Sequence, residues 1–223
     1  MRLISHIDAV EELLRHGIAA ERREWSLGDT VMVPLGAAFE HSGTVVFSSV
    51  AWLVPNSRDA WDLVQMLSQR ERRRRFSSLE LAVAEALELT KLYDCMGACS
   101  ACGGVEHLSF GEWCGLGQMT YWIATSCGTC GACSEADGGD SLPEELREIE
   151  LRRHGTWRLT TSAEHSPRAW SAIRAELALG LPELAALKRT LPGELFRGTL
   201  AEVSRLQARL ARAHVQTELH EAV

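Results

Sequence analysis

Residues 95–104 read CMGACSACGG, and residues 127–133 read CGTCGAC. Cys99 and Cys102 are separated by two residues, as are Cys127 and Cys130, and all 7 cysteines of the 223-residue chain fall between residues 95 and 133. A secreted disulfide scaffold usually spreads its cysteines along the chain and follows a signal peptide. The clustering therefore favours a metal site over a disulfide framework.

Two CxxC pairs on tight turns provide four thiolates, which are the ligands of a closed, tetrahedral structural zinc site. Gly103 and Gly131 directly follow the pairs, and glycine permits the positive φ that turns backbone amides toward sulfur. The pairs resemble those of zinc ribbons, and the stretches SFGEWC and MTYWIAT are expected to form the ribbon strands. We predict one structural zinc ion, with the ligands Cys99, Cys102, Cys127 and Cys130.

Three cysteines remain, namely Cys95, Cys114 and Cys133. Cys130 and Cys133 also have two-residue spacing, so Cys95 or Cys133 can substitute in the main set, and the three thiols with His107 form a candidate second metal site. The alternative is that Cys114 is a small buried hydrophobe and that the other two are spare thiols. A third interpretation is redox-active or unmetallated cysteines, and a redox-active cysteine requires a thiolate with a lowered pKa.

Working outward, residues 1–93 predict a small α+β domain. Ile7, Val10, Leu14 and Ile18 recur at helical spacing, and short β-branched runs at 30–33, 44–47, 50–54 and 61–67 predict antiparallel strands. Ser77 and Glu80 have capping-box spacing at the start of a helix over residues 76–92, with Leu79, Val83, Ala86 and Leu87 facing inward. The order of these elements resembles, in outline only, that of bacterial immunity proteins.

Residues 94–139 form the predicted zinc ribbon, and residues 140–155 form an acidic linker with a short helix, for which Ser141 and Glu144 have capping-box spacing. Residues 156–223 begin with a strand-like TWRLT, continue with helical stretches at 167–179 and 200–212 and a shorter one between them, and close with a strand-like segment at 215–219. We expect an apolar core in this last domain, consisting of Ile173, Leu177, Leu187, Leu206 and Leu210.

The last domain resembles the C-terminal domain of the bacterial ribosomal stalk protein. The resemblance is carried by Ile173, Arg174, the LGL at 179–181, Glu183, Leu187, Pro192 and Gly198. It implies a β-α-α-β-α-β fold, which is also similar to that of the Clp protease adaptor. The stalk family recruits translational GTPases through a basic face. Arg174 is retained here, but Ser171, Pro182 and Ala185 occupy positions that are usually lysine, so we expect the fold without the stalk function.

Composition and charge narrow the function classes. With 46% hydrophobic and 24% charged residues, the chain has the composition of a folded globular protein rather than a disordered one. The first residues are amphipathic rather than a signal peptide, so we expect a cytoplasmic protein without membrane contact. The net charge of −7 argues against nucleic acid as a partner. The run RERRRR contains Arg72, Arg73, Arg74 and Arg75, which are either a partner contact or a solvated strand end or turn.

No phosphate loop, HExxH helix or nucleophile elbow occurs in the sequence, and no small-molecule substrate is evident. We therefore expect a non-enzymatic bacterial protein-interaction module, an immunity or adaptor protein whose partner is another protein, with a toxin as one candidate. The alternative is a ribosome-associated or translation factor that engages translational GTPases or RNA, using the stalk-like domain with Arg174, the zinc ribbon and the run Arg70–Arg75 together. An enzyme or redox sensor that uses Cys95, Cys114 or Cys133 is the third interpretation.

Overall fold

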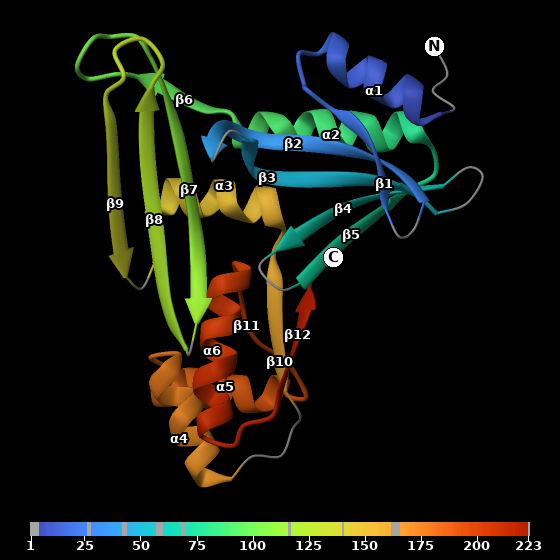
Figure 1. Ribbon diagram of the computed structural model, residues 1–223. Coiled ribbons are helices and arrows are strands. Elements are labelled where there is room, and N and C mark those ends of the chain that lie inside the picture. Colours follow the sequence, from blue (N-terminus) through green and yellow to red (C-terminus); the bar gives the residue numbers. More distant parts are fainter. Residues whose placement is uncertain are drawn as a thin grey trace. The chain divides into compact units, whose positions relative to one another are not determined.

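The computed structural model describes residues 5–25, 28–41, 44–56, 60–67, 70–115, 117–139, 141–161 and 166–222. It has an α+β fold, as predicted, with helices and antiparallel sheets (Figure 1). The chain splits into two compact units. Unit 1 contains Met1–Ser109 and Ala124–Ser134, and unit 2 contains Phe110–Ile123 and Glu135–Val223. These units do not follow the predicted segments, because the strands of the ribbon are divided between them.

Unit 1 contains a five-stranded sheet in sequential order, β1 (Glu21–Trp25), β2 (Gly28–His41), β3 (Thr44–Pro55), β4 (Trp61–Leu67) and β5 (Arg70–Phe76). All four neighbouring pairs are antiparallel. Val31 pairs with Leu53 and Val33 with Ala51, and these side chains are fully buried. Such alternating apolar residues suit a pleated sheet with one face against the core. The two runs predicted at 44–47 and 50–54 belong to one strand, β3.

Two helices complete the core of unit 1, α1 (His6–Arg15) and α2 (Leu79–Tyr93), which contact each other and β2. Helix α1 buries Ala9 and Leu13. Of the apolar residues at helical spacing, Val10 and Ile18 are partly buried against the core, whereas Ile7 and Leu14 are more than half exposed. Helix α2 is capped by Ser78, whose hydroxyl accepts from the Leu81 amide, and not by Ser77. The predicted inward residues Leu79, Val83 and Ala86 are buried in the core, and Leu87 is partly buried against it.

A four-stranded sheet follows in the order β6 (Cys95–Ala98), β7 (Val105–Gly115), β8 (Gln118–Cys127) and β9 (Cys133–Gly139). The stretches predicted as ribbon strands lie within β7 and β8. Helix α3 (Glu144–His154) comes next. Its N-cap is Pro143 without a side-chain hydrogen bond, so the capping box predicted from Ser141 and Glu144 does not form.

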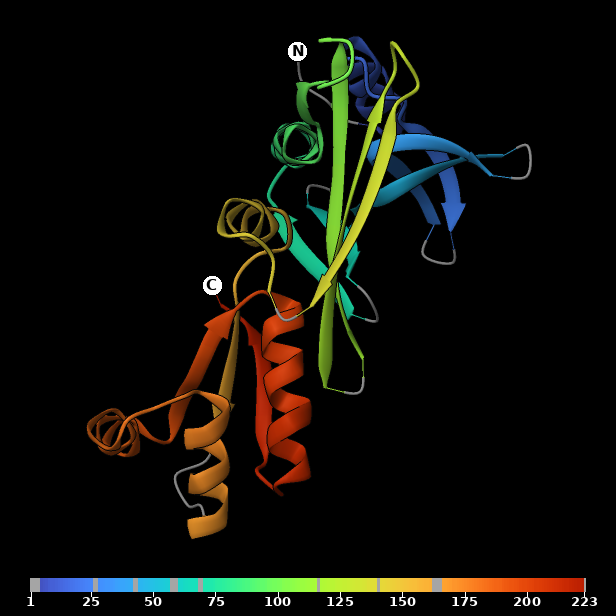
Figure 2. The ribbon, with the colours of Figure 1, turned by 90° about the vertical axis from the view of Figure 1, so that its left-hand side faces the viewer.

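The last part of unit 2 consists of β10 (Trp157–Thr161), α4 (Pro167–Glu176), α5 (Leu181–Thr190), β11 (Gly193–Gly198), α6 (Leu200–Arg212) and β12 (Thr217–Glu221). Residues 157–221 thus have the β-α-α-β-α-β order that the stalk resemblance implies. The three strands form an antiparallel sheet in the order β11-β10-β12, and α6 packs along it (Figure 2).

The core of this part is built mainly by β10 and α6. Ile173, Leu206 and Leu210 are buried as predicted. Leu177 and Leu187 are only half-buried, and Leu184 is the buried leucine of α5. No helix in the described part of the chain combines the length and the apolar character that crossing a membrane requires.

Candidate metal centre

The two CxxC pairs adopt the same backbone turn. In the first turn the Cys99 amide donates to the Gly104 carbonyl, and the Gly103 amide donates back to the Cys99 carbonyl, both at 2.8 Å. In the second turn the Cys127 amide donates to Ala132 and the Gly131 amide donates to Cys127, at 2.8 and 3.0 Å. Gly103 and Gly131 have φ of 72° and 71°, a region that favours glycine. The prediction of positive φ at both glycines is confirmed.

These turns bring the four predicted thiols together within unit 1. The Sγ atoms of Cys99, Cys102, Cys127 and Cys130 all lie within 4.8 Å of one another. Cys99 Sγ is 3.8 Å from Cys130 Sγ, and Cys102 Sγ is 3.6 Å from Cys127 Sγ. A tetrahedral zinc ion with Zn–S bonds of about 2.3 Å places its sulfurs ~3.8 Å apart. The separations of 3.6 and 3.8 Å therefore agree with a tetrahedral metal ion, and the four cysteines form no disulfides.

The electrostatics of the cluster favour thiolate at one cysteine. Backbone amides of Cys130 and Thr129 donate to the Cys127 sulfur and lower its pKa to about 6. At Cys102 the Gly104 amide, at 3.3 Å from the sulfur, lowers the pKa, but the three neighbouring thiols and burial outweigh it and raise the pKa to about 11. Four thiols this close cannot all ionise alone, so a divalent cation is the natural counter-charge.

Gly104 is a supporting residue that the sequence analysis missed. A Cβ at this position would lie 2.5 Å from Thr129 Oγ1 and 3.2 Å from Cys102 Sγ. Any side chain would therefore push the two turns apart at the place where the sulfurs meet. The GG dipeptide at 103–104 is the sequence feature that indicates this role, but the prediction concerned only Gly103.

The structure does not assemble a second metal site from the remaining cysteines. Among the described residues, only the four clustered cysteines bring three or more ligand groups together. Cys114 lies on β7 in unit 2, half-buried, where burial raises the pKa of its thiol. Cys133 is exposed at the start of β9.

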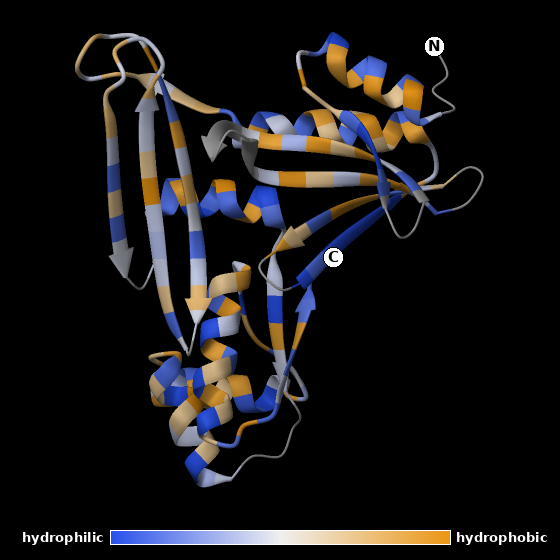
Figure 3. Cartoon of the chain, viewed as in Figure 1, coloured by the Kyte–Doolittle hydropathy of each residue, from blue (hydrophilic) through white to orange (hydrophobic). Residues whose placement is uncertain are grey.

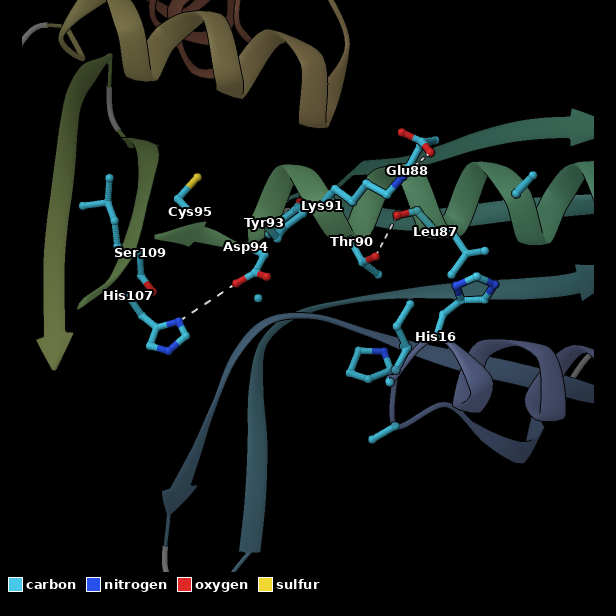
Figure 4. A pocket seen from close by; sticks show the side chains of 17 residues that line it. His16, Leu87, Glu88, Thr90, Lys91, Tyr93, Asp94, Cys95, His107 and Ser109 are labelled. Atoms are coloured by element: carbon cyan, nitrogen blue, oxygen red, sulfur yellow. Dashed lines mark hydrogen bonds and ion pairs between the residues drawn. The ribbon is translucent and has the colours of Figure 1, made fainter. Parts of the chain in front are cut away.

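Cys95 and His107 line a cavity of about 750 Å³ in unit 1, next to the C-terminal ends of α1 and α2 (Figure 4). His107 Nδ1 is 4.0 Å from Asp94 Oδ1, and Cys95 Sγ donates to the Leu92 carbonyl at 3.5 Å. In the β6–β7 pairing Cys95 is opposite Leu108, while Met96 is opposite His107. The thiol and the imidazole accordingly point in opposite directions, and they form no nucleophile–base pair.

The arginine run is a strand rather than a turn, and Figure 3 shows β5 hydrophilic along its length. Its arginines meet acceptors from unit 1. Asp62, fully buried on β4, accepts from Arg73 Nη1 and Arg75 Nε, both at 3.1 Å. Burial raises the pKa of Asp62, but hydrogen bonds from Asn56, Arg75 and Arg73 outweigh it and leave that pKa below its ordinary value.

The alternate arginines of β5 meet other partners. Arg72 Nη1 donates to Gln65 Oε1 at 3.3 Å, and Arg74 pairs with Glu85 of α2. The predicted partner-binding arginines of β5 are therefore held by internal acceptors. Arg174 is exposed at the end of α4, and its Nε donates to the Leu179 carbonyl at 3.1 Å.

Comparison with known proteins adds no family to this geometry. No family model, no curated protein and no solved structure matches the chain.

Proposed function

We propose that this chain is a non-enzymatic protein-interaction module of the immunity or adaptor kind, in which one structural zinc ion holds the ribbon. The observation that carries the proposal is the cluster of four thiols with tetrahedral spacing, formed by two turns of the same geometry. Four protein ligands close the coordination sphere, whereas a catalytic zinc keeps a position for water or substrate. Zinc bound here would supply cross-linking rather than Lewis-acid chemistry.

The choice of zinc rests on the donor set. Four thiolates in a tetrahedron suit zinc or an iron–sulfur centre, and spacings of 3.6 and 3.8 Å agree with one mononuclear ion. The Gly- and Cys-rich segment around the cluster has few aliphatic side chains, so the metal would provide the stability that a small core does not.

Metal analysis of protein purified without chelator tests the zinc. We expect about one zinc per chain, lost on replacement of Cys127 by serine and retained on replacement of the exposed Cys133, which is the matched control. Iron with visible charge-transfer absorption, or a metal-free chain with the same hydrogen-exchange protection in residues 95–134, would contradict the proposal.

The interaction role is tested separately. The zinc-loaded chain is cross-linked in lysate, and each captured protein is then purified and titrated against the chain. We expect a one-to-one complex with a single protein that survives 0.15 M salt. Turnover of a small molecule by the purified chain would instead refute the non-enzymatic assignment.

A second candidate, a factor that engages translational GTPases, is favoured by one feature of unit 2. Arg174 and Lys188 line a hollow of about 340 Å³ with Leu181, which is 66% exposed, and Lys188 Nζ lies 4.8 Å from the centre of the Trp170 ring. Exposed Ser171, Pro182 and Ala185 reduce the positive charge there relative to the stalk family. Sedimentation of lysate tests it: migration with ribosomal large subunits that salt abolishes would favour this candidate.

A further inference from the structure

The sequence that contains the ribbon has an extreme charge distribution. Between Lys91 and Arg147, residues 92–146 contain no lysine or arginine but eight acidic residues. The stretch supplies no lysine or arginine of its own, and the cations that contact it, such as Arg153 and Arg209, come from α3 and α6. Its chemistry therefore suits a cationic partner.

One face of the ribbon packs within unit 2. Phe110 of β7 lies against Arg153 of α3, whose guanidinium carbon is 4.0 Å from the ring centre. Glu112, two residues on, interacts with Thr199 and with charged groups of α3 and α6. Because side chains alternate along a strand, residues 111, 113 and 115 point to the opposite face.

That opposite face carries two exposed tryptophans, Trp113 of β7 at 57% and Trp122 of β8 at 40%. A Cβ on Gly111 would lie 3.0 Å from Trp122 Nε1, and a Cβ on Gly115 would lie 1.9 Å from Trp113 Cη2. Each indole thus lies over a glycine, where no side chain lifts it from the sheet. Both rings rest against the strands and leave a π surface toward solvent.

Two carboxylates share this face. Tyr121 of β8 lies against Gly138 of β9, and Thr125 Oγ1 is 2.9 Å from Ser134 Oγ, so these four residues are on the other side. Alternation then places Glu135 and Asp137 of β9, both exposed, on the side of Trp122. The face combines indole rings with carboxylates, and all of these residues belong to unit 2.

We propose that this face, named the indole–carboxylate face and formed by Trp113, Trp122, Glu135 and Asp137, binds an arginine-rich segment of a partner protein. Guanidinium groups stack on indoles by cation–π attraction and pair with carboxylates at the same time. An acidic surface repels phosphate backbones, which argues against nucleic acid as the occupant. The inference rests on the proposed interaction role and names the chemistry of the partner.

The test is calorimetric titration of the full, zinc-loaded chain with a ten-residue peptide of alternating arginine and glycine. A peptide with glutamate in place of arginine is the control. We expect binding of the arginine peptide alone, weakening as salt rises, with shifts of the Trp113 and Trp122 indole N–H signals in NMR spectra. A folded chain that does not bind this peptide, or binds it while both indole signals stay unmoved, overturns the proposal.

Variants separate the face from general electrostatics. Trp113→Leu and Trp122→Leu should each weaken binding about two- to fivefold, the equivalent of an exposed cation–π contact, while Trp170→Leu in α4 should not. The pair Glu135→Gln with Asp137→Asn should weaken binding more than Glu145→Gln with Glu148→Gln, which removes the same charge from α3. Equal losses in both pairs would show diffuse attraction only and refute the face.

Two further outcomes identify other occupants. Tighter binding of a single-stranded oligonucleotide or of an oligosaccharide than of the arginine peptide would replace the proposed partner class. The interaction role can be told apart from this inference, because a purified protein partner that binds the Trp113→Leu/Trp122→Leu chain unchanged leaves the role intact and removes only the face.

Discussion

Replacing Glu112 by glutamine should stabilise unit 2 at alkaline pH. Burial is the main cause that raises the pKa of Glu112, and the negative charges of Glu150 and Glu202 raise it further. The Thr199 hydrogen bond lowers it, and the resulting pKa is about 7. Arg147 also lowers the pKa of Glu112. Its effect is limited because its Nε lies 2.6 Å from Glu202 Oε1, and this ion pair offsets much of the positive charge. Oε1 of Glu112 has no hydrogen-bond partner among the described residues.

The sign and size follow from proton linkage. An unfolded glutamate loses its proton near its ordinary value of 4.5, whereas folded Glu112 keeps it to about 7. The contribution of Glu112 to the free energy of unfolding is therefore fully present below pH 4.5 and is lost as the pH rises to about 7. The difference corresponds to about 3 kcal/mol, and we expect ~2 kcal/mol because water still reaches part of the side chain. Glutamine keeps the shape without the charge.

The assay is urea unfolding at pH values from 5 to 8, followed by hydrogen exchange in α3 and α6. Across this pH range the free energy of unfolding of the wild-type chain should fall by about 2 kcal/mol relative to that of Glu112→Gln. The two chains share every other ionisable group, so effects common to both largely cancel in the difference. Glu148→Gln on exposed α3 surface is the charge-matched control. Identical pH profiles of the wild-type and Glu112→Gln chains would refute the reasoning.

Three other variants test the rest of the structure. Gly104→Ala should weaken metal binding, since its Cβ would meet Thr129, whereas Gly128→Ala, with open space around it, should not; competition with a chromogenic chelator measures both. Leu206→Ala should cost about 2–5 kcal/mol in urea unfolding of unit 2 because it leaves a cavity under α6; a loss below ~1 kcal/mol would contradict the packing. Asp62→Asn should destabilise unit 1 by about 1–3 kcal/mol at pH 7, since a buried acceptor of two arginines loses its charge. Wild-type stability from Asp62 should be present at neutral pH and be lost as the pH falls below 3.8, which acid titration of both chains measures.

The sequence predicted what depends on local pattern. The cysteine pairs carry their own turn geometry in the glycine that follows each pair, so the metal cluster needed no knowledge of the rest of the fold. Helix α6 is bounded as predicted, since its apolar residues recur at helical spacing. Helical spacing at residues 7, 10, 14 and 18 predicts the helix α1 but not its buried residues, because Ala9 and Leu13 compete with them and only packing on α2 and β2 decides.

Strand β5 shows why some elements are invisible to such patterns. RERRRRF has no apolar alternation, so its pattern does not distinguish a solvated strand end from a turn. Alternate arginines of β5 instead differ in the partners they contact. Arg73 and Arg75 pair with Asp62, whereas Arg72 donates to Gln65 and Arg74 pairs with Glu85. Arginine serves on either face of a strand, since its long stem packs while its guanidinium finds an acceptor. Which acceptor it finds depends on the sheet register, which residues 70–76 alone do not contain.

Different interactions stabilise different parts of the ribbon, so these parts are expected to open under different conditions. Residues 105–109 and 124–127 of β7 and β8 belong to the unit with the cysteine cluster, and residues 110–123 belong to the unit with Glu112 and Arg153. Metal binding and Glu112 protonation are therefore expected to act on separate parts of the same two strands. Chelation should raise hydrogen exchange at 95–109 and 124–134 first, and alkaline pH should raise it at 110–115. If chelation opened 95–134 in one step, the two strands would behave as one cooperative unit, and the Glu112 contacts would not stabilise their share independently.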